Sequence, residues 1–305
     1  YADSGDFRHV MQETLHKRRR MAVVRLEAAN SLSKEMEKYF CEKFNIRPEC
    51  IFRTKMPMKL GFIFAIADKL PDSMKRSLTD PPFTPQPPAS LADGSVMDQV
   101  RKKDVLLSYP YESMDPFLQL IKEAASDPDV MTIKITIYRL ASTSKIARIL
   151  CRAAENGKDV LVLVELKARF DEENNIEWSR RLERAGCNVI YGLNGYKVHS
   201  KLCLISRRMD DGVSYITQIG TGNYNEKTSA LYTDLSLITA NQGIGKEAAN
   251  VFAALLKGET VEETNLLLVA PKCLQNRIVD MIDEEIEHAK RGEEAYIGIK
   301  INSLT

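Results

Sequence analysis

The chain has 305 residues, of which 44% are hydrophobic and 28% charged, a composition typical of ordinary globular proteins. Lys plus Arg number 43 against 42 Asp plus Glu, and this balance argues against a protein whose whole surface binds nucleic acid. The six cysteines form no C-x-x-C pair, which indicates reduced thiols in the cytosol rather than a zinc or disulfide framework. No apolar run reaches the ~20 residues of a membrane span, and the N-terminal segment lacks the apolar core of a signal peptide.

The first 80 residues predict a small region of mixed structure. Residues 30–44 form a charged helical stretch, and residues 21–29 alternate like a strand. The basic run over 16–20 has the composition of a nucleic-acid-binding patch, but its place beside the strand-like segment favours a solvated basic edge. Five prolines within residues 80–89 then predict a linker, because proline interrupts helices and central strands.

From residue 104 onward, short apolar runs alternate with helical segments, which is typical of α/β architecture. The run over 159–166 is almost entirely apolar, as expected of a strand buried on both faces of a parallel sheet. A turn over 210–212 predicts a hairpin. Strands are expected over 104–110, 131–139, 159–166, 187–192, 199–207, 214–220 and 235–239, and helices from Asp115 and over 144–157, 175–186 and 246–258.

Residues 265–304 repeat the order and spacing of residues 104–140: a strand that ends in proline, a helix and a second strand. This internal match predicts that a second α/β unit begins near residue 265. The chain ends about forty residues into it, so we expect this second unit to be truncated and the chain to be a piece of a longer protein.

His199 is the histidine that invites a chemical interpretation. The other three, His9, His16 and His288, lie in polar or highly charged segments where solvation explains them. His199 and Lys201 open a predicted strand and share one of its faces, because side chains alternate along a strand. An ordinary strand start could carry the same two residues, so spacing alone leaves both interpretations open.

Several neighbours favour an anion site around this pair. Arg139 and Arg169 each follow an apolar strand, and the carboxyl ends of parallel strands are where open α/β sheets bind ligands. Arg binds phosphate in a bidentate manner and Lys201 adds a point charge, while the backbone of Gly220–Asn223 can approach a phosphate closely. The alternative is that each Arg merely reaches solvent at a strand end. Cations nearby would lower the pKa of His199 and leave a ring nitrogen free to attack phosphorus.

These residues carry a resemblance to a known family. His199-x-Lys201 followed by Gly220-x-Gly222-Asn223 resembles the phospholipase-D-like motif His-x-Lys-x₄-Asp followed by Gly-x-x-Asn, except that Ser206 replaces the motif's Asp. The longer strings YPYESMDPF, ITIYRLAS, ELKARFDEENNI, KVHSKLCLI and GTGNYNEKTSALYTD are similar to polyphosphate kinase, a family that makes polyphosphate reversibly from ATP.

The resemblance implies a role for each site residue. His199 matches the histidine that becomes phosphorylated, with Lys201 beside it. Arg139 and Arg169 match arginines of the phosphate and Mg²⁺ site, and because a guanidinium cannot ligate a cation, we interpret both as phosphate clamps next to the metal.

Three more positions acquire roles from the same resemblance. Tyr232 matches a tyrosine that contacts the nucleotide, although a half-buried aromatic beside a strand would look the same. Asp234 is expected to hold the tautomer of the catalytic histidine, and Asn223 is expected to bind nucleotide or phosphate.

The implied fold is a phospholipase-D-like mixed sheet flanked by helices, preceded by part of an α+β head domain. The expected domains are the C-terminal part of the head domain (1–90), a first catalytic domain (91–264) and the truncated start of a second (265–305). The implied partners are ATP or ADP and polyphosphate, with Mg²⁺ as cofactor and a homo-oligomer at full length. We expect a cytoplasmic protein that can lie peripherally at the membrane, with no integral membrane association and no nucleic acid bound. Two other functions stay open, a phospholipase-D-like phosphodiesterase and a non-catalytic polyphosphate- or nucleic-acid-binding fragment.

Overall fold

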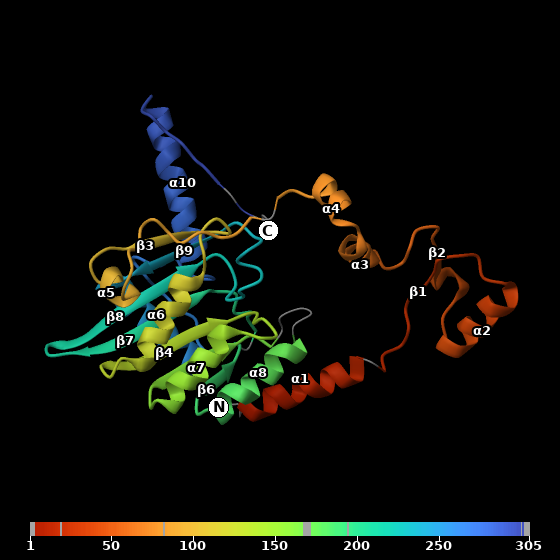
Figure 1. Cartoon of the computed structure of the whole chain (residues 1–305), viewed down its shortest axis with the longest axis horizontal. Helices are drawn as coiled ribbons and strands as arrows, with labels where there is room; N and C mark the ends of the chain where they lie inside the picture. Colours follow the sequence, from red (N-terminus) through yellow and green to blue (C-terminus); the bar gives the residue numbers. More distant parts are fainter. Residues whose placement is uncertain are drawn as a thin grey trace. The chain divides into compact units, whose positions relative to one another are not determined.

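The computed structural model describes residues 4–18, 20–81, 83–166, 172–193, 195–299 and 301 (Figure 1). The chain divides into two compact units, residues 1–83 and 84–305, and the boundary falls within the proline-rich segment. Among the described helices, none combines the length and apolar character needed to cross a membrane.

The smaller unit is mainly helical. Ser33 ends the preceding loop and begins a helix, because its side chain accepts a hydrogen bond from the Met36 N–H, the usual N-cap arrangement. The strand predicted over 21–29 shortens to three residues, which pair in parallel with a second short strand. The elements are α1 (Ser4–Arg18), β1 (Leu26–Ala28), α2 (Lys34–Phe44), the 3₁₀ helix η1 (Pro48–Cys50), β2 (Ile51–Arg53), α3 (Phe62–Lys69) and α4 (Asp72–Leu78).

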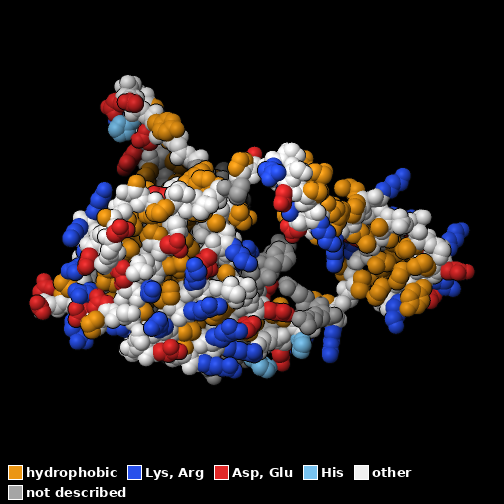
Figure 2. All heavy atoms as spheres, viewed as in Figure 1, with side chains coloured by type: hydrophobic (Ala, Val, Ile, Leu, Met, Phe, Trp, Pro, Cys, Tyr) orange, Lys and Arg blue, Asp and Glu red, His pale blue; other side chains and the backbone are white. Residues whose placement is uncertain are grey.

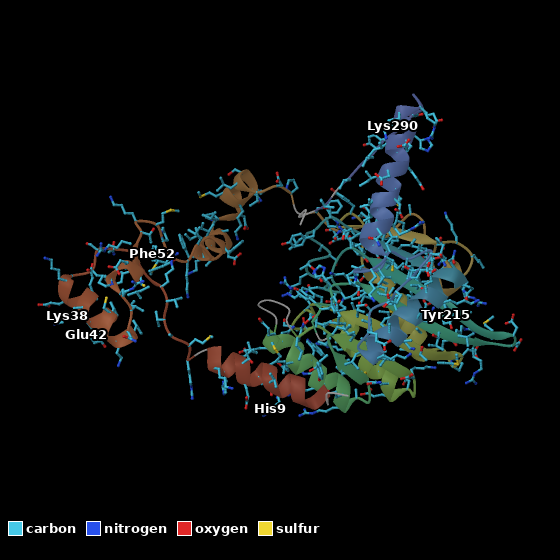
Figure 3. The ribbon with its side chains drawn as sticks, turned by 180° about the vertical axis from the view of Figure 1, so that it is seen from behind. His9, Lys38, Glu42, Phe52, Tyr215 and Lys290 are labelled. Carbon is cyan, nitrogen blue, oxygen red and sulfur yellow. The ribbon has the colours of Figure 1, made fainter. Side chains whose placement is uncertain are left out.

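The surface of this unit carries part of the basic run and a group of exposed apolar side chains. Residues 16–18 of the basic run lie in the last turn of α1 rather than at a strand edge, and His16 and Lys17 are exposed to solvent. Apolar side chains gather over the region of α3, β1 and β2 (Figure 2). Phe64 of α3 is 78% exposed, and Phe52 of β2 (labelled in Figure 3) lies under the Arg25 guanidinium.

The larger unit is built on one mixed sheet of seven strands, in the order β3-β9-β8-β7-β4-β5-β6. Strands β4, β5 and β6 run parallel, whereas every pair from β4 through β7, β8 and β9 to β3 is antiparallel. The mixed sheet flanked by helices confirms the predicted fold class, and each strand expected between residues 104 and 239 is present. The elements are α5 (Val96–Val100), β3 (Val105–Tyr109), α6 (Asp115–Ser126), β4 (Val130–Ile137), α7 (Lys145–Glu155), β5 (Asp159–Val164), α8 (Glu172–Arg184), β6 (Asn188–Tyr191), β7 (Leu202–Met209), β8 (Gly212–Gly220), β9 (Asp234–Thr239), α9 (Gln242–Lys257) and α10 (Leu274–Lys290).

Helices cover both faces of this sheet. On one face α9 packs Val251 and Phe252 against Leu161 of β5 and Leu204 of β7. Helices α6, α7 and α8 pack against β4, β5 and β6, where alternate residues such as Ile133 are fully buried. Burial on both faces explains why β5 is an almost continuous apolar run. In β4, polar residues such as Lys134 alternate with the buried apolar ones.

The predicted strand–helix–strand over 265–304 is only partly formed. Helix α10 is present, but no strand forms over 265–273 or over the described residues between 293 and 301. A strand needs a neighbour for its backbone groups, and here the Glu247 carboxylate accepts the N–H groups of residues 265–267 instead, at 2.8–3.2 Å. A helix satisfies its own backbone groups and therefore forms without a partner strand.

Gly245 provides a test of the packing of α9 on the sheet. A Cβ at this position would come within 3.0 Å of the side chain of Tyr215 on β8 (Figure 3). We expect Gly245→Ala to lower the free energy of unfolding by about 1–3 kcal/mol, the usual cost of overpacking. Lys246→Ala, at the exposed next position of the same helix, should change it by less than about 0.5 kcal/mol. Urea unfolding followed by circular dichroism measures both, and equal effects would contradict the packing.

Candidate functional site

One edge of the large sheet gathers the residues that sequence analysis singled out. Because β7 is antiparallel to β4, the segment before β7 lies beside the segment after β4. The C-terminal end of β8 and the N-terminal end of β9 reach the same edge, since β8 pairs with both β7 and β9 in antiparallel fashion. This topology brings side chains from three parts of the chain to one place: Tyr138 and Arg139, His199 and Lys201, and Asp234.

Two buried side chains hold the segment that carries His199. Strand β7 begins only at Leu202, so His199 and Lys201 precede the strand rather than open it. The reason is Thr136, whose hydroxyl donates to the Ser200 carbonyl (2.8 Å) and accepts from the Leu202 N–H (3.1 Å), in place of backbone pairing. The Glu165 carboxylate, 1% exposed, accepts from the Val198 N–H at 2.8 Å.

The His199 imidazole is exposed but closely surrounded. Lys201 Nζ lies 3.1 Å from Nδ1 and 3.3 Å from Nε2, so one ammonium contacts both ring nitrogens without selecting either. The Tyr138 ring meets the imidazole at 4.6 Å between centroids, with planes inclined by 72°. The Tyr138 ring also has three cations around it: the charged groups of Lys197, Lys201 and Arg139 lie 5.4–5.6 Å from its centroid.

These surroundings set the protonation of the two central groups. Burial lowers the pKa of His199, and the charges of Lys201, Lys197 and Arg139 lower it further. The imidazole is therefore neutral at neutral pH, as predicted. Burial also lowers the pKa of Lys201 to about 8, against an opposing effect of the Asp234 carboxylate. Because this pKa is still above 7, Lys201, which is only 5% exposed, remains charged at pH 7 but loses its proton more readily than a surface lysine.

The Gly220–Asn223 turn lies against Asp234. Thr221 Oγ1 donates to Asp234 Oδ1 at 2.8 Å and accepts from the Leu235 N–H at 2.9 Å. A Cβ at Gly222 would lie 2.5–2.9 Å from the atoms of the Asp234 side chain, so only glycine fits there without displacing the carboxylate. The glycine thus serves the close approach of a side chain rather than an unusual backbone angle.

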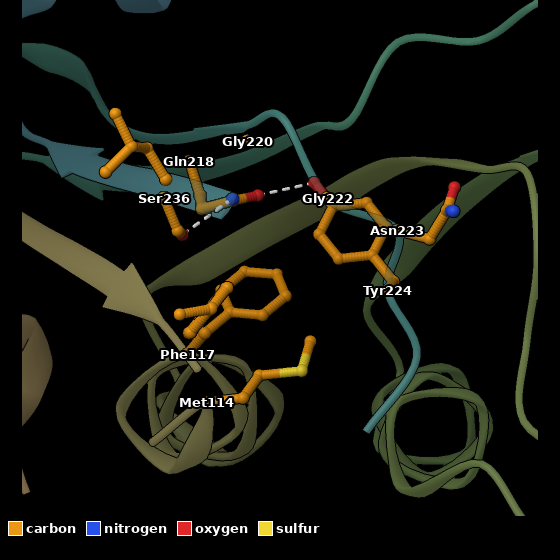
Figure 4. Close-up of a pocket in the computed structure, with 10 residues that line it drawn as sticks. Met114, Phe117, Gln218, Gly220, Gly222, Asn223, Tyr224 and Ser236 are labelled. Atoms are coloured by element: carbon orange, nitrogen blue, oxygen red, sulfur yellow. Dashed lines mark hydrogen bonds between the residues drawn. The ribbon is translucent and has the colours of Figure 1, made fainter. Parts of the chain in front are cut away.

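A polar network supports this turn from below. The Tyr224 hydroxyl, in a side chain 3% exposed, donates to Gln218 Oε1, and Gln218 Nε2 donates to Ser236 Oγ at 2.9 Å (Figure 4). Tyr224 also stacks on Phe117 of α6 at 5.2 Å. The pocket drawn in Figure 4 lies among these side chains and Asn223. The turn is therefore supported by side chains that are packed and hydrogen-bonded to one another.

The predicted site residues are brought together to different extents. Arg139 lies in the cation cluster around His199, whereas Arg169 falls outside the described residues. Asp234 is bonded to Thr221, and no hydrogen bond joins it to His199 in the described part of the chain, so its orienting role stays a prediction.

Two further predicted residues lie in the loop between β8 and β9. Tyr232 is 64% exposed. The amide oxygen of Asn223 is buried without a hydrogen-bond partner among the described residues.

Three residues of the site were not predicted. Tyr138 lies beside Arg139 in ITIYR. Lys197 precedes His199 by two residues, so the alternation Lys-x-His-x-Lys could have indicated Lys197. Glu165 ends a strongly apolar strand, where a carboxylate must find buried hydrogen-bond donors.

Ser206, which replaces the motif's Asp, lies inside the sheet. Its side chain is 6% exposed, and it accepts a hydrogen bond from Thr132 Oγ1 at 3.0 Å. It therefore belongs to the β4–β7 pairing.

Among the described residues, the donor set near His199 does not fit a metal held by protein ligands, since no group of three or more His, Cys, Asp or Glu side chains is arranged to hold an ion. The charged groups that lower the pKa of His199 are cations, which bind anions rather than Mg²⁺.

Comparison with known proteins gives a consistent result along the whole chain. Family models match consecutively: the polyphosphate kinase middle domain over residues 2–66, C-terminal domain 1 over 95–262 and C-terminal domain 2 over 267–305. The polyphosphate kinase of Staphylococcus epidermidis is 41% identical over 97% of this chain and 40% of its own length. That of Halalkalibacterium halodurans is 40% identical over 98% of this chain and 43% of its own length.

A solved structure agrees with these sequences. The crystal structure of polyphosphate kinase from Porphyromonas gingivalis matches with a TM-score of 0.69 and 36% identity, over 86% of this chain and 40% of that chain. The chain thus spans about two fifths of the length of these relatives. Because the model of C-terminal domain 1 alone covers more than half of its residues, the chain belongs to the polyphosphate kinase family.

Proposed function

We propose that this chain is the middle part of an enzyme that transfers the terminal phosphoryl group of ATP reversibly to polyphosphate through a phosphohistidine at His199. The observation that carries the proposal is an imidazole kept neutral among Lys197, Lys201 and Arg139 at an open sheet edge. A neutral ring nitrogen has the lone pair that nucleophilic attack requires. Cations around it attract the anionic substrate.

The reaction has two balanced steps. In the first, a ring nitrogen of His199 donates its lone pair to the terminal phosphorus of ATP, and a P–N bond forms as the bond to the bridging oxygen breaks. ADP leaves with that electron pair. In the second step, a terminal oxygen of the polyphosphate chain attacks the same phosphorus, the P–N bond breaks, and neutral imidazole returns. Neither step needs an oxidant or reductant.

The cations provide most of the catalytic assistance in this proposal. In phosphoryl transfer, positioning and charge stabilisation of the equatorial oxygens account for most of the rate enhancement. Lys201 Nζ lies 3.1 Å from His199 Nδ1 and the charge of Arg139 acts on the same imidazole, so we assign these two cations to those oxygens. Mg²⁺ bound to the phosphates of the nucleotide would add further charge neutralisation there.

Other properties belong to the whole protein. We propose the domain boundaries at residues 90 and 264, with the remainder of the second catalytic domain outside this chain. A homo-oligomer, a cytoplasmic location and the nucleotide contact of Tyr232 are proposals of the same kind. All assays below therefore use the full-length protein that carries these 305 residues.

Transfer of label from ATP tests the proposal directly. Incubation with γ-³²P-ATP and Mg²⁺ should give an acid-labile, base-stable label on the wild type and none on His199→Ala. His288→Ala is the matched control, since His288 lies on α10 and pairs with Glu293. Labelling that survives His199→Ala would refute the site, and release of phosphodiester products without ATP consumption would favour a phosphodiesterase.

Polyphosphate binding that persists in His199→Ala, with no label on the wild type, would favour a binding module instead.

The pH dependence of labelling at subsaturating ATP tests the role of Lys201. Since its pKa is about 8, loss of the ammonium charge should produce an alkaline limb centred near pH 8. On the acid side the rate should persist below the ordinary pKa of histidine, because the lowered pKa of His199 keeps the ring neutral there. Lys201→Arg, whose side chain stays charged, should label more slowly but lose the alkaline limb. A limb near pH 8 in both proteins would exclude Lys201 as its source.

A further inference from the structure

Tyr138 makes a specific contact with the proposed nucleophile. Its ring lies 4.6 Å from the His199 ring, with an interplanar angle of 72°. This is the edge-to-face arrangement that aromatic pairs prefer, in which the positive edge of one ring meets the negative face of the other. In addition to the Lys201 ammonium, which contacts both ring nitrogens, the Tyr138 ring lies against the exposed His199 side chain, so the contact restricts where the imidazole can point.

The same ring is the centre of the cation cluster. Lys201 Nζ lies 5.4 Å, Arg139 Cζ 5.5 Å and Lys197 Nζ 5.6 Å from its centroid, all within the reach of cation–π attraction. Three like charges around one point repel each other, an effect that the Asp234 carboxylate opposes at Lys201. The negative face of the ring partly offsets that repulsion.

The position of Tyr138 itself is fixed by its backbone. Asn175, fully buried on α8, donates through Nδ2 to the carbonyls of Tyr138 (2.8 Å) and Glu165 (3.0 Å). These bonds tie the ends of β4 and β5 together and do not involve the tyrosine ring. The Tyr138 hydroxyl makes no hydrogen bond within the described ranges. The contacts described for this side chain are therefore made by its ring.

We infer that Tyr138 is a positioning residue for phosphoryl transfer, whose ring holds the His199 imidazole and keeps Lys201, Lys197 and Arg139 around it. This role rests on the proposed function. The ring does not touch the reacting phosphorus. It sets the place of the groups that do, and in the absence of substrate it preserves the arrangement that a terminal phosphate meets on arrival.

Ring-retaining and ring-removing substitutions separate this role from others. In the full-length protein, Tyr138→Phe should label from γ-³²P-ATP within about twofold of the wild type. Tyr138→Leu and Tyr138→Met should label about 10–100-fold more slowly at saturating ATP, because small displacements of reacting groups have effects of that size. Tyr196→Leu is the matched control, since Tyr196 lies three residues before His199 and its side chain is 49% exposed. Circular dichroism verifies that each variant is folded.

A spectroscopic measurement tests the contact without catalysis. With ¹³Cε1-labelled histidine, the His199 resonance, assigned by its loss in His199→Ala, should carry the same ring-current shift in the wild type and Tyr138→Phe. It should lose that shift in Tyr138→Leu and Tyr138→Met. If the wild type accepts no label, the proposed function fails, while this spectrum still decides whether the ring holds the imidazole.

Two outcomes would overturn the inference although the wild type is labelled. If the ring-removing variants label within twofold of the wild type, the ring does not position His199. If Tyr138→Phe is as slow as Tyr138→Leu, the hydroxyl and not the ring is required.

Discussion

The site depends on the antiparallel pairing of β7 with β4. Strands β4 and β5 alone, being parallel, would bring only their own C-terminal ends to the edge. Reversal at β7 brings the beginning of a distant segment to that edge, and the buried Thr136 hydroxyl fixes it there through the Ser200 carbonyl and the Leu202 N–H. Without this side-chain bridge, neither His199 nor Lys201 would have a defined place beside the end of β4.

The electrostatic character of the site follows from this arrangement. The chain as a whole is almost neutral, yet three cations and one imidazole converge on a single ring. Burying Lys201 is unfavourable, as its lowered pKa records. A bound anion would offset this cost, which is consistent with the proposed function, because functional sites often keep such unfavourable charges.

The strands between residues 104 and 239 could be predicted because each has a clear local pattern: a continuous apolar run in β5 and β-branched residues in β4. Prediction failed at residues 265–273, because an apolar run becomes a strand only when a neighbour pairs with it, and here Glu247 takes the backbone donors. At the site, strand ends indicated Arg139 and the motif indicated His199. The contact of Tyr138 with His199 could not be predicted, because it arises between segments about sixty positions apart whose approach depends on the order of strands in the sheet.

The fold explains why Ser206 can replace the Asp of the phospholipase-D-like motif. Five residues along an extended strand separate it from Lys201, a distance of roughly 16 Å, so a side chain at this position lies far from the His199 imidazole. A carboxylate there would be nearly buried opposite Thr132 and would need strong hydrogen-bond donors, whereas a hydroxyl is satisfied by one threonine. The substitution is therefore explained by the sheet interior. On the proposed function, the difference between phosphoryl transfer and phosphodiester hydrolysis therefore lies in the groups at the sheet edge. The nucleotide of the proposed reaction leaves as a stable anion that needs no protonation, and cations such as Lys201 and Arg139 are suited to stabilise the charge on the transferred phosphoryl group.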